Sequence, residues 1–457
     1  MDMNNDNVKP NAFALVPFLV FAIFYVGLSL HAKYFCHVDM AFYKVPMPVA
    51  FLVASATALV FNRRKSLEEK IDTYATGMGE TNIMIMCLIF ILAGAFASVA
   101  KGSGAVDAAV TLAQSVIPSR LMVAGVFLIS CVISLAIGTS CGTIAAVAPI
   151  ALGFAEPLHL SPALLLGAVV GGSMFGDNLS MISDTTIAAT RTQGVRMKDK
   201  FLANICIASP AALLALILYA VQGASAGTVA APAVTWQHLL LVLPYVLILV
   251  LALLGLNVML LLFSGTVLAS VIGTCLGRTA LFDVMDAAGT SVATPGVLEL
   301  LGKGTLGMSE TLIVAILAGG LFHTIQANGG IRWLTDRIAL LVRGPRTCEL
   351  GTFLLVALVN CFTANNTVAI VIAGPIAKTC SDKFRAAPVR IASVLDTASC
   401  IIQGLIPYGA QILIALGIVN TMNTQMSAFD LMKNLYYQPL LALAVFATIF
   451  FSRARED

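Results

Sequence analysis

Charged residues are scarce in this chain of 457 residues. Asp, Glu, Lys and Arg make up 11% of it, against about 25% in an average soluble protein, which excludes an ordinary soluble domain. The 26 Lys and Arg against 23 Asp and Glu leave a net charge of +3. That excess is too small and too dispersed to indicate nucleic-acid binding or a polybasic membrane-binding tail.

Metal-binding and catalytic motifs are missing as well. The ten cysteines form no CxxC pair, and most of them lie inside apolar runs, which is typical of cysteine used as a small apolar residue. The five histidines are dispersed and no HExxH motif occurs, so we expect neither a metal centre nor a cofactor, and no enzyme activity. The start, MDMNNDNVKPN, lacks the basic region of a signal peptide, and we expect the apolar run after it to be retained.

Long apolar runs are abundant instead. Hydrophobic residues make up 59% of the chain, and a spanning helix needs about 20 mostly apolar residues in a row. Such runs follow one another from residues 12–31 to residues 431–451. The sequence therefore predicts an all-α polytopic membrane protein.

An internal duplication divides the chain. Gly94 matches Gly320 at an offset of 226, and the same offset pairs Pro149 with Pro375 within a shared Pro-Ile-Ala run. The match extends to Leu405. We therefore expect two halves, residues 12–222 and 238–451.

Basic residues indicate that the two halves have opposite orientations. Cytoplasmic loops carry an excess of Lys and Arg, and the basic loops of the first half match uncharged segments of the second. Conversely, residues 152–164 contain no Lys or Arg, whereas their partner, 378–390, has four. An inverted repeat of this kind needs an odd number of crossings in each half. The basic residues of the two first-half loops compared in this way are Arg63, Arg64, Lys65, Lys70, Arg191, Arg196, Lys198 and Lys200.

Five spans in each half satisfy this requirement and place both termini in the cytoplasm. Two further apolar stretches, 121–151 and 347–377, must then enter and leave on the same side, as re-entrant hairpins with polar tips. Such non-helical backbone is tolerated only inside protein or beside a cavity. The predicted spans are residues 12–31, 45–61, 82–100, 163–190, 202–222, 238–256, 257–277, 310–328, 391–416 and 431–451.

The most polar segment within an apolar region is GGSMFGDNLSMISDTTIAATRTQG, from Gly171 to Gly194. An unpaired carboxylate inside a membrane costs about 2.5–3.5 kcal/mol on insertion scales, and such groups are usually functional. Asp184 is our first candidate for an ion-binding carboxylate and Asp177 our second. Glycines and hydroxyl side chains predict that this helix is broken, which would expose oxygen ligands of the kind that hard cations prefer.

The second half contains a segment that matches Gly171–Gly194 but lacks its carboxylates. Gln403 stands where the first half has Asp177. Asp396 is a further carboxylate in that half. The predicted ion- and proton-binding residues are Asp177, Asn178, Ser183, Asp184, Thr185, Asn365, Asn366, Asp396 and Thr397, with Thr139, Ser140, Ser180, Thr186, Thr367 and Gln403 as secondary candidates. The alternative is that the hydroxyl and amide groups only join helices by hydrogen bonds, or shape turns.

The motif GDNLSMISDTT, with LDTASCIIQGLIPYGA further along, resembles the NhaC-type sodium/proton antiporter family. The resemblance covers residues 77–420. Asn178, Met181 and Tyr408 depart from the family's usual Lys, Pro and Trp. The resemblance implies exchange of sodium for protons in the bacterial cytoplasmic (inner) membrane, and it leaves a homodimer open.

We therefore expect secondary active exchange, in which one carboxylate binds sodium or a proton and the site alternates between the two sides. A carrier of a small organic acid or amino acid is the alternative. It would need a fixed positive partner, and neither GDNLSMISDTT nor LDTASCIIQGLIPYGA contains Lys or Arg, which favours a bare cation. An ion channel is a third option, although inverted repeats with hairpins favour alternating access.

Overall fold

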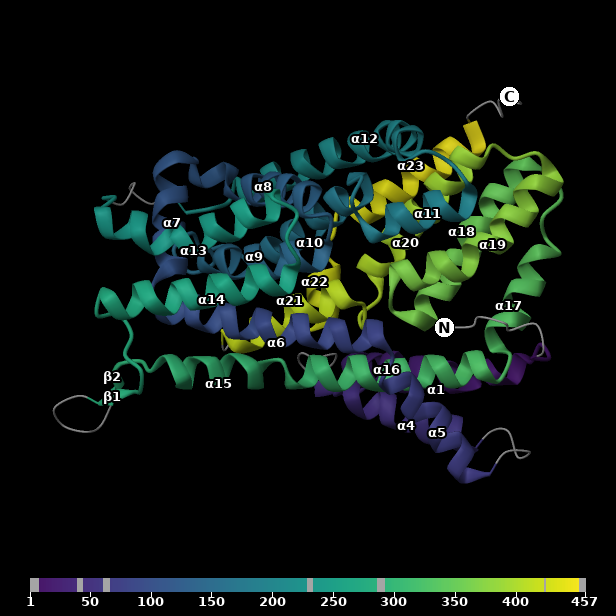
Figure 1. Cartoon of the computed structure of the whole chain (residues 1–457), viewed down its shortest axis with the longest axis horizontal. Coiled ribbons are helices and arrows are strands. Elements are labelled where there is room, and N and C mark those ends of the chain that lie inside the picture. The colour runs from purple at the N-terminus through teal and green to yellow at the C-terminus, as the bar shows by residue number, and fades with distance from the viewer. Residues whose placement is uncertain are drawn as a thin grey trace.

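The computed structural model describes residues 8–38, 44–60, 66–227, 233–285, 292–422 and 425–451. These residues fold into an elongated bundle of helices (Figure 1). The first part comprises the short helical turns η2 (Ala12–Leu15), η3 (Ile23–Gly27) and η4 (Ser119–Leu121), and the helices α1 (Val16–Ala22), α2 (Leu28–Tyr34), α4 (Met47–Val60), α5 (Leu67–Met78), α6 (Thr81–Gly102), α7 (Ala105–Val116), α8 (Met122–Ile137), α9 (Ser140–Gly153), α10 (Pro162–Leu179), α11 (Asp184–Gln193) and α12 (Met197–Gly223).

The remaining helices follow in the same bundle, and one small antiparallel ladder pairs Val284 with Thr294. The elements of this second part are α13 (Trp236–Leu253), α14 (Val258–Cys275), β1 (Val284–Met285), β2 (Val292–Thr294), α15 (Val297–Gly307), α16 (Ser309–Ala327), α17 (Gly330–Ala339), α18 (Pro345–Thr363), α19 (Asn366–Phe384), α20 (Pro388–Leu405), α21 (Ala410–Thr421), α22 (Ala428–Met432) and α23 (Tyr437–Phe451).

Ten helical stretches in the described part of the chain are long and apolar enough to cross a bilayer. Eight of them coincide with predicted spans, and the other two, Ser119–Ile137 and Pro345–Thr363, contain the first arms of the predicted hairpins. The predicted spans 45–61 and 431–451 correspond to the shorter apolar helices α4 and α23. The prediction of a polytopic helical protein is therefore confirmed in its main part, and the small β ladder is the one departure within the described residues.

The predicted loop after residue 61 is partly helical. Arg63, Arg64 and Lys65 lie outside the described residues, but Lys70 lies in α5 and donates to the carbonyl of Leu59 at 2.9 Å. This helix starts because Ser66 and Glu69 form a capping box, each side chain accepting from the other residue's backbone N–H.

Each of the two stretches predicted as hairpins forms a pair of helices joined by a sharp turn. Gly138 joins α8 to α9 with φ +73°, a conformation that glycine adopts without strain. A Cβ at Gly138 would also lie 2.6 Å from the Ile182 side chain, so the tip approaches residue 182 closely. Ala364 makes the corresponding turn between α18 and α19 with φ +49°.

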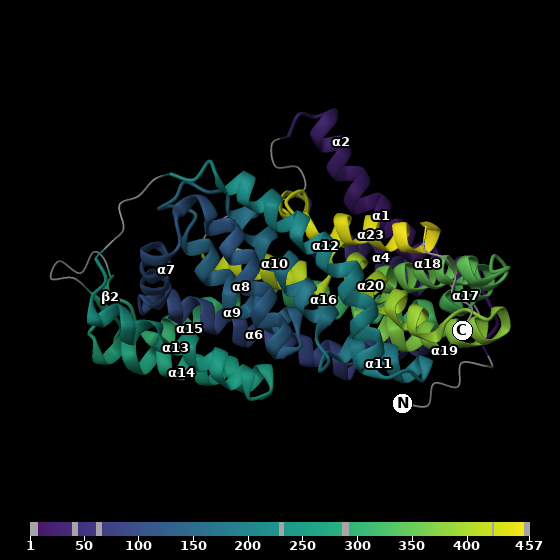
Figure 2. The same cartoon turned by 90° about the horizontal axis from the view of Figure 1, so that it is seen from above.

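Helix α10 lies in the interior and packs closely on α8 (Figures 1 and 2). A Cβ at Gly172 would lie 2.4 Å from the Phe127 carbonyl oxygen, so glycine lets the two backbones meet. Ser134 on α8 donates to the Ser173 carbonyl at 2.5 Å. In the second part, α18 and α20 are joined in the same way, through the Asn360 amide and the Ser399 carbonyl at 2.8 Å.

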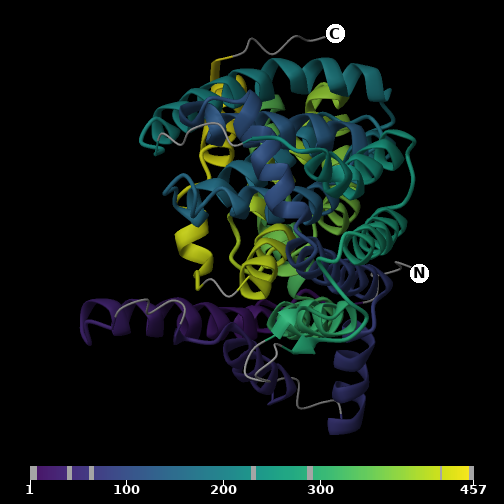
Figure 3. The same ribbon diagram turned by 90° about the vertical axis from the view of Figure 1, so that its left-hand side faces the viewer.

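Two long interrupted helices run beside each other, α5–α6 and α15–α16. Glycines let them approach: a Cβ at Gly77 would lie 2.7 Å from the Gly319 carbonyl oxygen, and one at Gly94 would lie 2.3 Å from the Gly304 carbonyl oxygen. Figure 3 shows α1 and α2 extending sideways from this layer, on the side away from α12. The layered arrangement leaves α10, α20 and the hairpin tips in the centre.

Candidate functional site

A cavity of about 170 Å³ lies where the hairpin tips meet the two broken helices. Such clefts with a few convergent polar groups are the usual place for a small-ligand site. Its polar lining comes from the start of α6, both tips and both breaks: Asn82, Thr139, Ser140, Cys141, Asp177, Ser183, Asp184, Thr185, Asn365, Asn366, Thr367, Gln403 and Gln411. The structure thus brings ten of the predicted site residues to one cavity.

Asp177, in the last turn of α10, is the buried carboxylate of this cavity, with 4% of its surface exposed. One carboxylate oxygen accepts from the Ser140 hydroxyl at 2.7 Å, and the other accepts from the Ser183 hydroxyl at 2.5 Å. Ser183 also contacts the Thr185 hydroxyl at 2.9 Å, and the Gln411 amide donates to Ser140 at 2.9 Å. Asp177 therefore joins the first tip to the first helix break.

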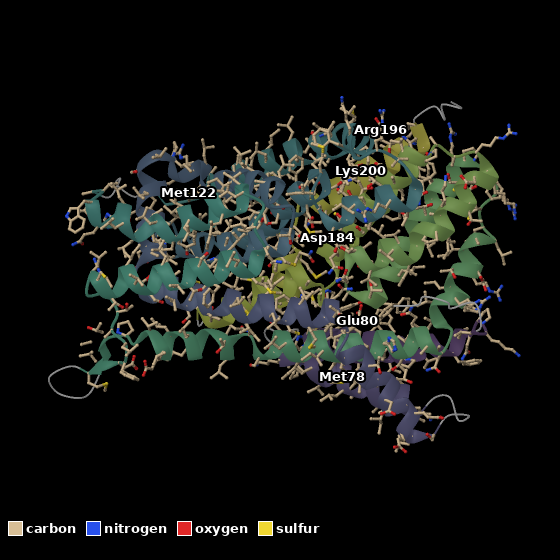
Figure 4. All side chains as sticks on the ribbon, in the orientation of Figure 1. Met78, Glu80, Met122, Asp184, Arg196 and Lys200 are labelled. Carbon is tan, nitrogen blue, oxygen red and sulfur yellow. The ribbon has the colours of Figure 1, made fainter. Side chains whose placement is uncertain are left out.

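The predicted break in the Gly171–Gly194 segment is confirmed. Helix α10 ends at Leu179, Ser180 and Ser183 adopt extended backbone conformations, and α11 begins at Asp184. Asp184 is exposed and lines the cavity, and within the described residues its side chain makes no hydrogen bond or ion pair. Figure 4 places it near the middle of the molecule's long axis. A carboxylate at a helix N-terminus is favoured by the helix dipole.

The second tip and break are held together by amides. Gln403, near the end of α20, donates to the Ala364 carbonyl at 2.6 Å. The side-chain oxygen of Asn365 accepts from the backbone N–H of Val368 at 3.0 Å and caps α19. The side-chain oxygen of Asn366 accepts from the N–H of Thr367 at 3.0 Å. Both tip asparagines thus shape the turn at the edge of the cavity.

A second polar cluster lies between α10, α12 and α20, outside the cavity lining. Lys200, in the first turn of α12, forms an ion pair with Asp396 of α20, and these side chains are 1% and 0% exposed. The Lys200 ammonium also donates to the Asn178 carbonyl and the Thr186 hydroxyl, each at 2.7 Å. Asn204, one turn further along α12, donates to the Asn178 side-chain oxygen at 2.5 Å and to Asp396 at 3.0 Å.

Comparison with known proteins decides the class of this protein. The sequence profile of the Na⁺/H⁺ antiporter family matches residues 10–224 and again residues 221–450. The chain belongs to the Na⁺/H⁺ antiporter family. The resemblance predicted from the sequence is therefore confirmed, and the protein is a multi-pass membrane protein of a transporter family.

Two curated relatives and one solved structure illustrate the range of similar proteins. The "Malate-2H(+)/Na(+)-lactate antiporter" of Bacillus subtilis (strain 168) is 24% identical over 396 residues, which cover 80% of this chain and 82% of the relative. The "Na(+)/H(+) antiporter NhaC" of the same organism is 25% identical over 416 residues, 85% of this chain and 88% of the relative. The crystal structure of the Alcanivorax borkumensis YdaH transporter matches 95% of this chain and 97% of that chain, with 16% identity and a TM-score of 0.40.

The antiporter's structure separates the remaining predicted residues from the cavity. Asn178, Thr186 and Asp396 belong to the cluster around Lys200. The hydroxyl of Thr397 donates to the Ser393 carbonyl of its own helix at 2.7 Å, and that of Ser180 accepts from the N–H of Ile182 at 3.4 Å. The last two side chains therefore bond locally.

The prediction that Lys200 is a basic loop residue is wrong, because its side chain is buried against Asp396 in the polar region. Figure 4 shows that Arg196 lies at the edge of the antiporter and that Lys200 lies further inside. A signal was present in the sequence: Lys200 and Asn204 are four residues apart and share one face of α12. A buried charge is tolerated where such partners meet it.

Proposed function

We propose that this antiporter exchanges sodium for protons by alternating access, with Asp177 as the group that binds either ion. The observation that carries the proposal is the Asp177 carboxylate itself, buried at a cavity and held by Ser140 and Ser183. Two ions that compete for one carboxylate are coupled without a second site, because binding of one releases the other. Thr185 and the oxygen atoms of both tips would complete the ligands of a hard cation.

The geometry favours Asp177 over Asp184 as this carboxylate. Asp177 contacts one hairpin tip and the first helix break, so a movement of the tip changes its surroundings. Asp184 is exposed at the cavity. The negative charge of Asp184 would attract cations to the cavity. Asp184 would not itself be enclosed with the bound cation.

The charges around the cavity favour a cation as substrate. Among the residues that line it there is no Lys or Arg, and the buried Lys200 is paired with Asp396. An anionic substrate would find carboxylates, uncharged polar groups and apolar side chains there, but no positively charged side chain. The cavity therefore suits a small cation.

Exchange of a small organic acid together with ions is the alternative. It is supported by the relative named as a malate and lactate antiporter, and by the volume of about 170 Å³, which is larger than a single dehydrated ion needs. The backbone N–H groups at the start of α9 and α19, next to the tips, could face a carboxylate.

We further propose that residues 12–222 and 238–451 are inverted repeats of five spans each, with both termini in the cytoplasm of a bacterial cell. Two observations support this: the family profile matches each half, and equivalent positions make equivalent bonds. Ser134 to Ser173 in the first half corresponds to Asn360 to Ser399 in the second, at the offset of 226. Repeats of this kind commonly place the ion site at their interface.

The test is sodium-dependent dequenching of a pH-sensitive dye in everted membrane vesicles. We expect Asp177→Asn to abolish the response, and Asp184→Asn to weaken it by raising the half-saturating sodium concentration. Asp382→Asn, at an exposed ion pair with Lys378, is the matched control and should behave like the parent. Unchanged exchange in Asp177→Asn would refute the site. A response to malate or lactate, but to no monovalent cation, would favour the alternative, and flux without movement of protons would indicate a channel.

A further inference from the structure

The Lys200 ammonium has the surroundings of a bound cation. It contacts one oxygen from each of three helices: the Asp396 carboxylate of α20, the Asn178 carbonyl of α10 and the Thr186 hydroxyl of α11. An ammonium group has three donors and no acceptor. All three donors therefore point at oxygen atoms in a site that is closed to solvent, since Lys200 is 1% exposed.

The helix break creates one of these oxygen ligands. In a continuous helix the Asn178 carbonyl would accept from the N–H of Ile182, but that N–H bonds to the Ser180 hydroxyl at 3.4 Å instead. The carbonyl thus lacks a backbone partner at the C-terminal end of α10, where the helix dipole favours a positive charge, and accepts from the Lys200 and Asn204 side chains instead. The backbone itself supplies this cation ligand.

Two further buried oxygens in the cluster lack a partner. Among the described residues, Oδ1 of Asp396 and Oδ1 of Asn204 have no hydrogen-bond donor. Asn204 uses its amide nitrogen for the Asn178 side chain and for Asp396, so both unpaired oxygens belong to side chains that already meet in this cluster. Carboxylate, carbonyl, hydroxyl and amide oxygens together are the ligand types of a hard cation site.

We propose that this cluster is a second cation-binding site of the antiporter, which the side chain of Lys200 fills with its own ammonium group. The lysine is a tethered cation: it neutralises Asp396 and holds the freed carbonyl of Asn178, but it cannot leave with the substrate. The chain then has one exchangeable site, at Asp177, because the charge of Asp396 is permanently balanced. Removal of the ammonium opens the second site to a small monovalent cation such as sodium or methylammonium.

Equilibrium binding of radioactive sodium to the purified full-length protein tests this proposal. We expect one bound sodium per chain in the parent, two in Lys200→Ala, and one again in Lys200→Ala/Asp396→Asn. Lys198→Ala is the matched control, since Lys198 is exposed on the same helix, and it should bind as the parent does. Folded Lys200→Ala protein that binds no more sodium than the parent would overturn the proposal.

Thermal unfolding in detergent covers the case in which Lys200→Ala is unstable. Sodium and methylammonium are then expected to raise its melting temperature, whereas choline, which is too large for the site, has no effect. The parent should not respond to methylammonium. A melting temperature of Lys200→Ala that neither small cation raises would overturn the proposal.

The transport interpretation rests on the proposed function, but the binding readout does not. If the parent bound no sodium, the role of Asp177 would fail, while the gain of one site in Lys200→Ala would still support the tethered cation. If the parent bound one sodium and Lys200→Ala gained none, the role of Asp177 would stand and that of Lys200 would fail. The two results are therefore distinguishable.

Discussion

Ser140 is the residue through which the first hairpin tip contacts Asp177, and its replacement by alanine tests the proposed site without changing a charge. The Ser140 hydroxyl donates to the carboxylate at 2.7 Å in a fully buried environment. This bond stabilises the ionised carboxylate, which is the form that binds sodium in the proposed mechanism. Ser140→Ala removes this hydroxyl donor and leaves the Ser183 hydroxyl and the backbone N–H of residue 140 on that group.

The expected effect follows from the strength of the lost bond. A hydrogen bond to a charged group contributes about 1.5–3 kcal/mol, and about 1.4 kcal/mol corresponds to a tenfold change in an equilibrium constant. We therefore expect the half-saturating sodium concentration of Ser140→Ala to rise by about 10- to 100-fold at constant pH. Dye dequenching in everted vesicles, titrated with sodium, measures this quantity directly.

Two controls separate this effect from a general disturbance. Ser173→Ala removes a buried hydroxyl from α10 that donates only to the Val169 carbonyl of its own helix at 2.7 Å, and it should leave the sodium titration unchanged. Gln411→Leu removes the amide that donates to Ser140 but keeps the Ser140 to Asp177 bond, so its effect should be smaller. A sodium titration of Ser140→Ala that matches the parent, with normal amounts of folded protein, would refute the role of this contact.

Three further predictions concern packing, stability and access. Gly176→Val should prevent accumulation of folded protein in size-exclusion chromatography, because a Cβ there would lie 2.5 Å from the backbone nitrogen of Leu135; Gly302→Ala, with open space around it, should not. Glu349→Ala removes the carboxylate that accepts from the Arg390 guanidinium at 2.5 Å and 2.6 Å. The free energy of unfolding should fall by about 3 kcal/mol, which would lower the melting temperature in detergent. An unchanged melting temperature would contradict this. Cys141 lines the cavity, so a maleimide should inhibit exchange, and bound sodium should slow that inhibition. Exchange by Cys141→Ala should resist the maleimide. Equal inhibition of that variant would place the reactive thiol elsewhere.

The positions of the helices and turns could be predicted because their causes are local. Apolar runs of spanning length became helices, and the interruptions fell where the sequence has glycine or clustered polar residues, at Gly138 and between Leu179 and Asp184. The helix α5 could not be predicted from hydropathy because four of its first six residues are charged, and a loop and an exposed helix differ little in composition there. Its capping box at Ser66 was a local signal that would have identified it.

The division of the polar residues into two sites could not be predicted from spacing. Asp177 and Asn178 are neighbours in sequence, yet the side chain of the first faces the cavity and that of the second contacts Asn204, because adjacent residues point in different directions around a helix. The burial of Lys200 depends on α20, which brings Asp396 to it from 196 residues away. Counting charges along the chain placed this lysine among the loop residues, since no pattern within α12 alone requires a carboxylate partner.

The proposed repeat explains why a carboxylate holds a hairpin tip in only one of the two halves. At the offset of 226, Gln403 occupies the place of Asp177, and both side chains hold a hairpin tip. The first tip presents a hydroxyl donor to Asp177, which suits an acid. The second tip presents the carbonyl oxygen of Ala364 at 2.6 Å from the Gln403 amide, and a carboxylate there would set two acceptors against each other without water. The chemistry of the two tips thus confines the acid to the first half, and leaves a single exchangeable charge in an otherwise similar frame.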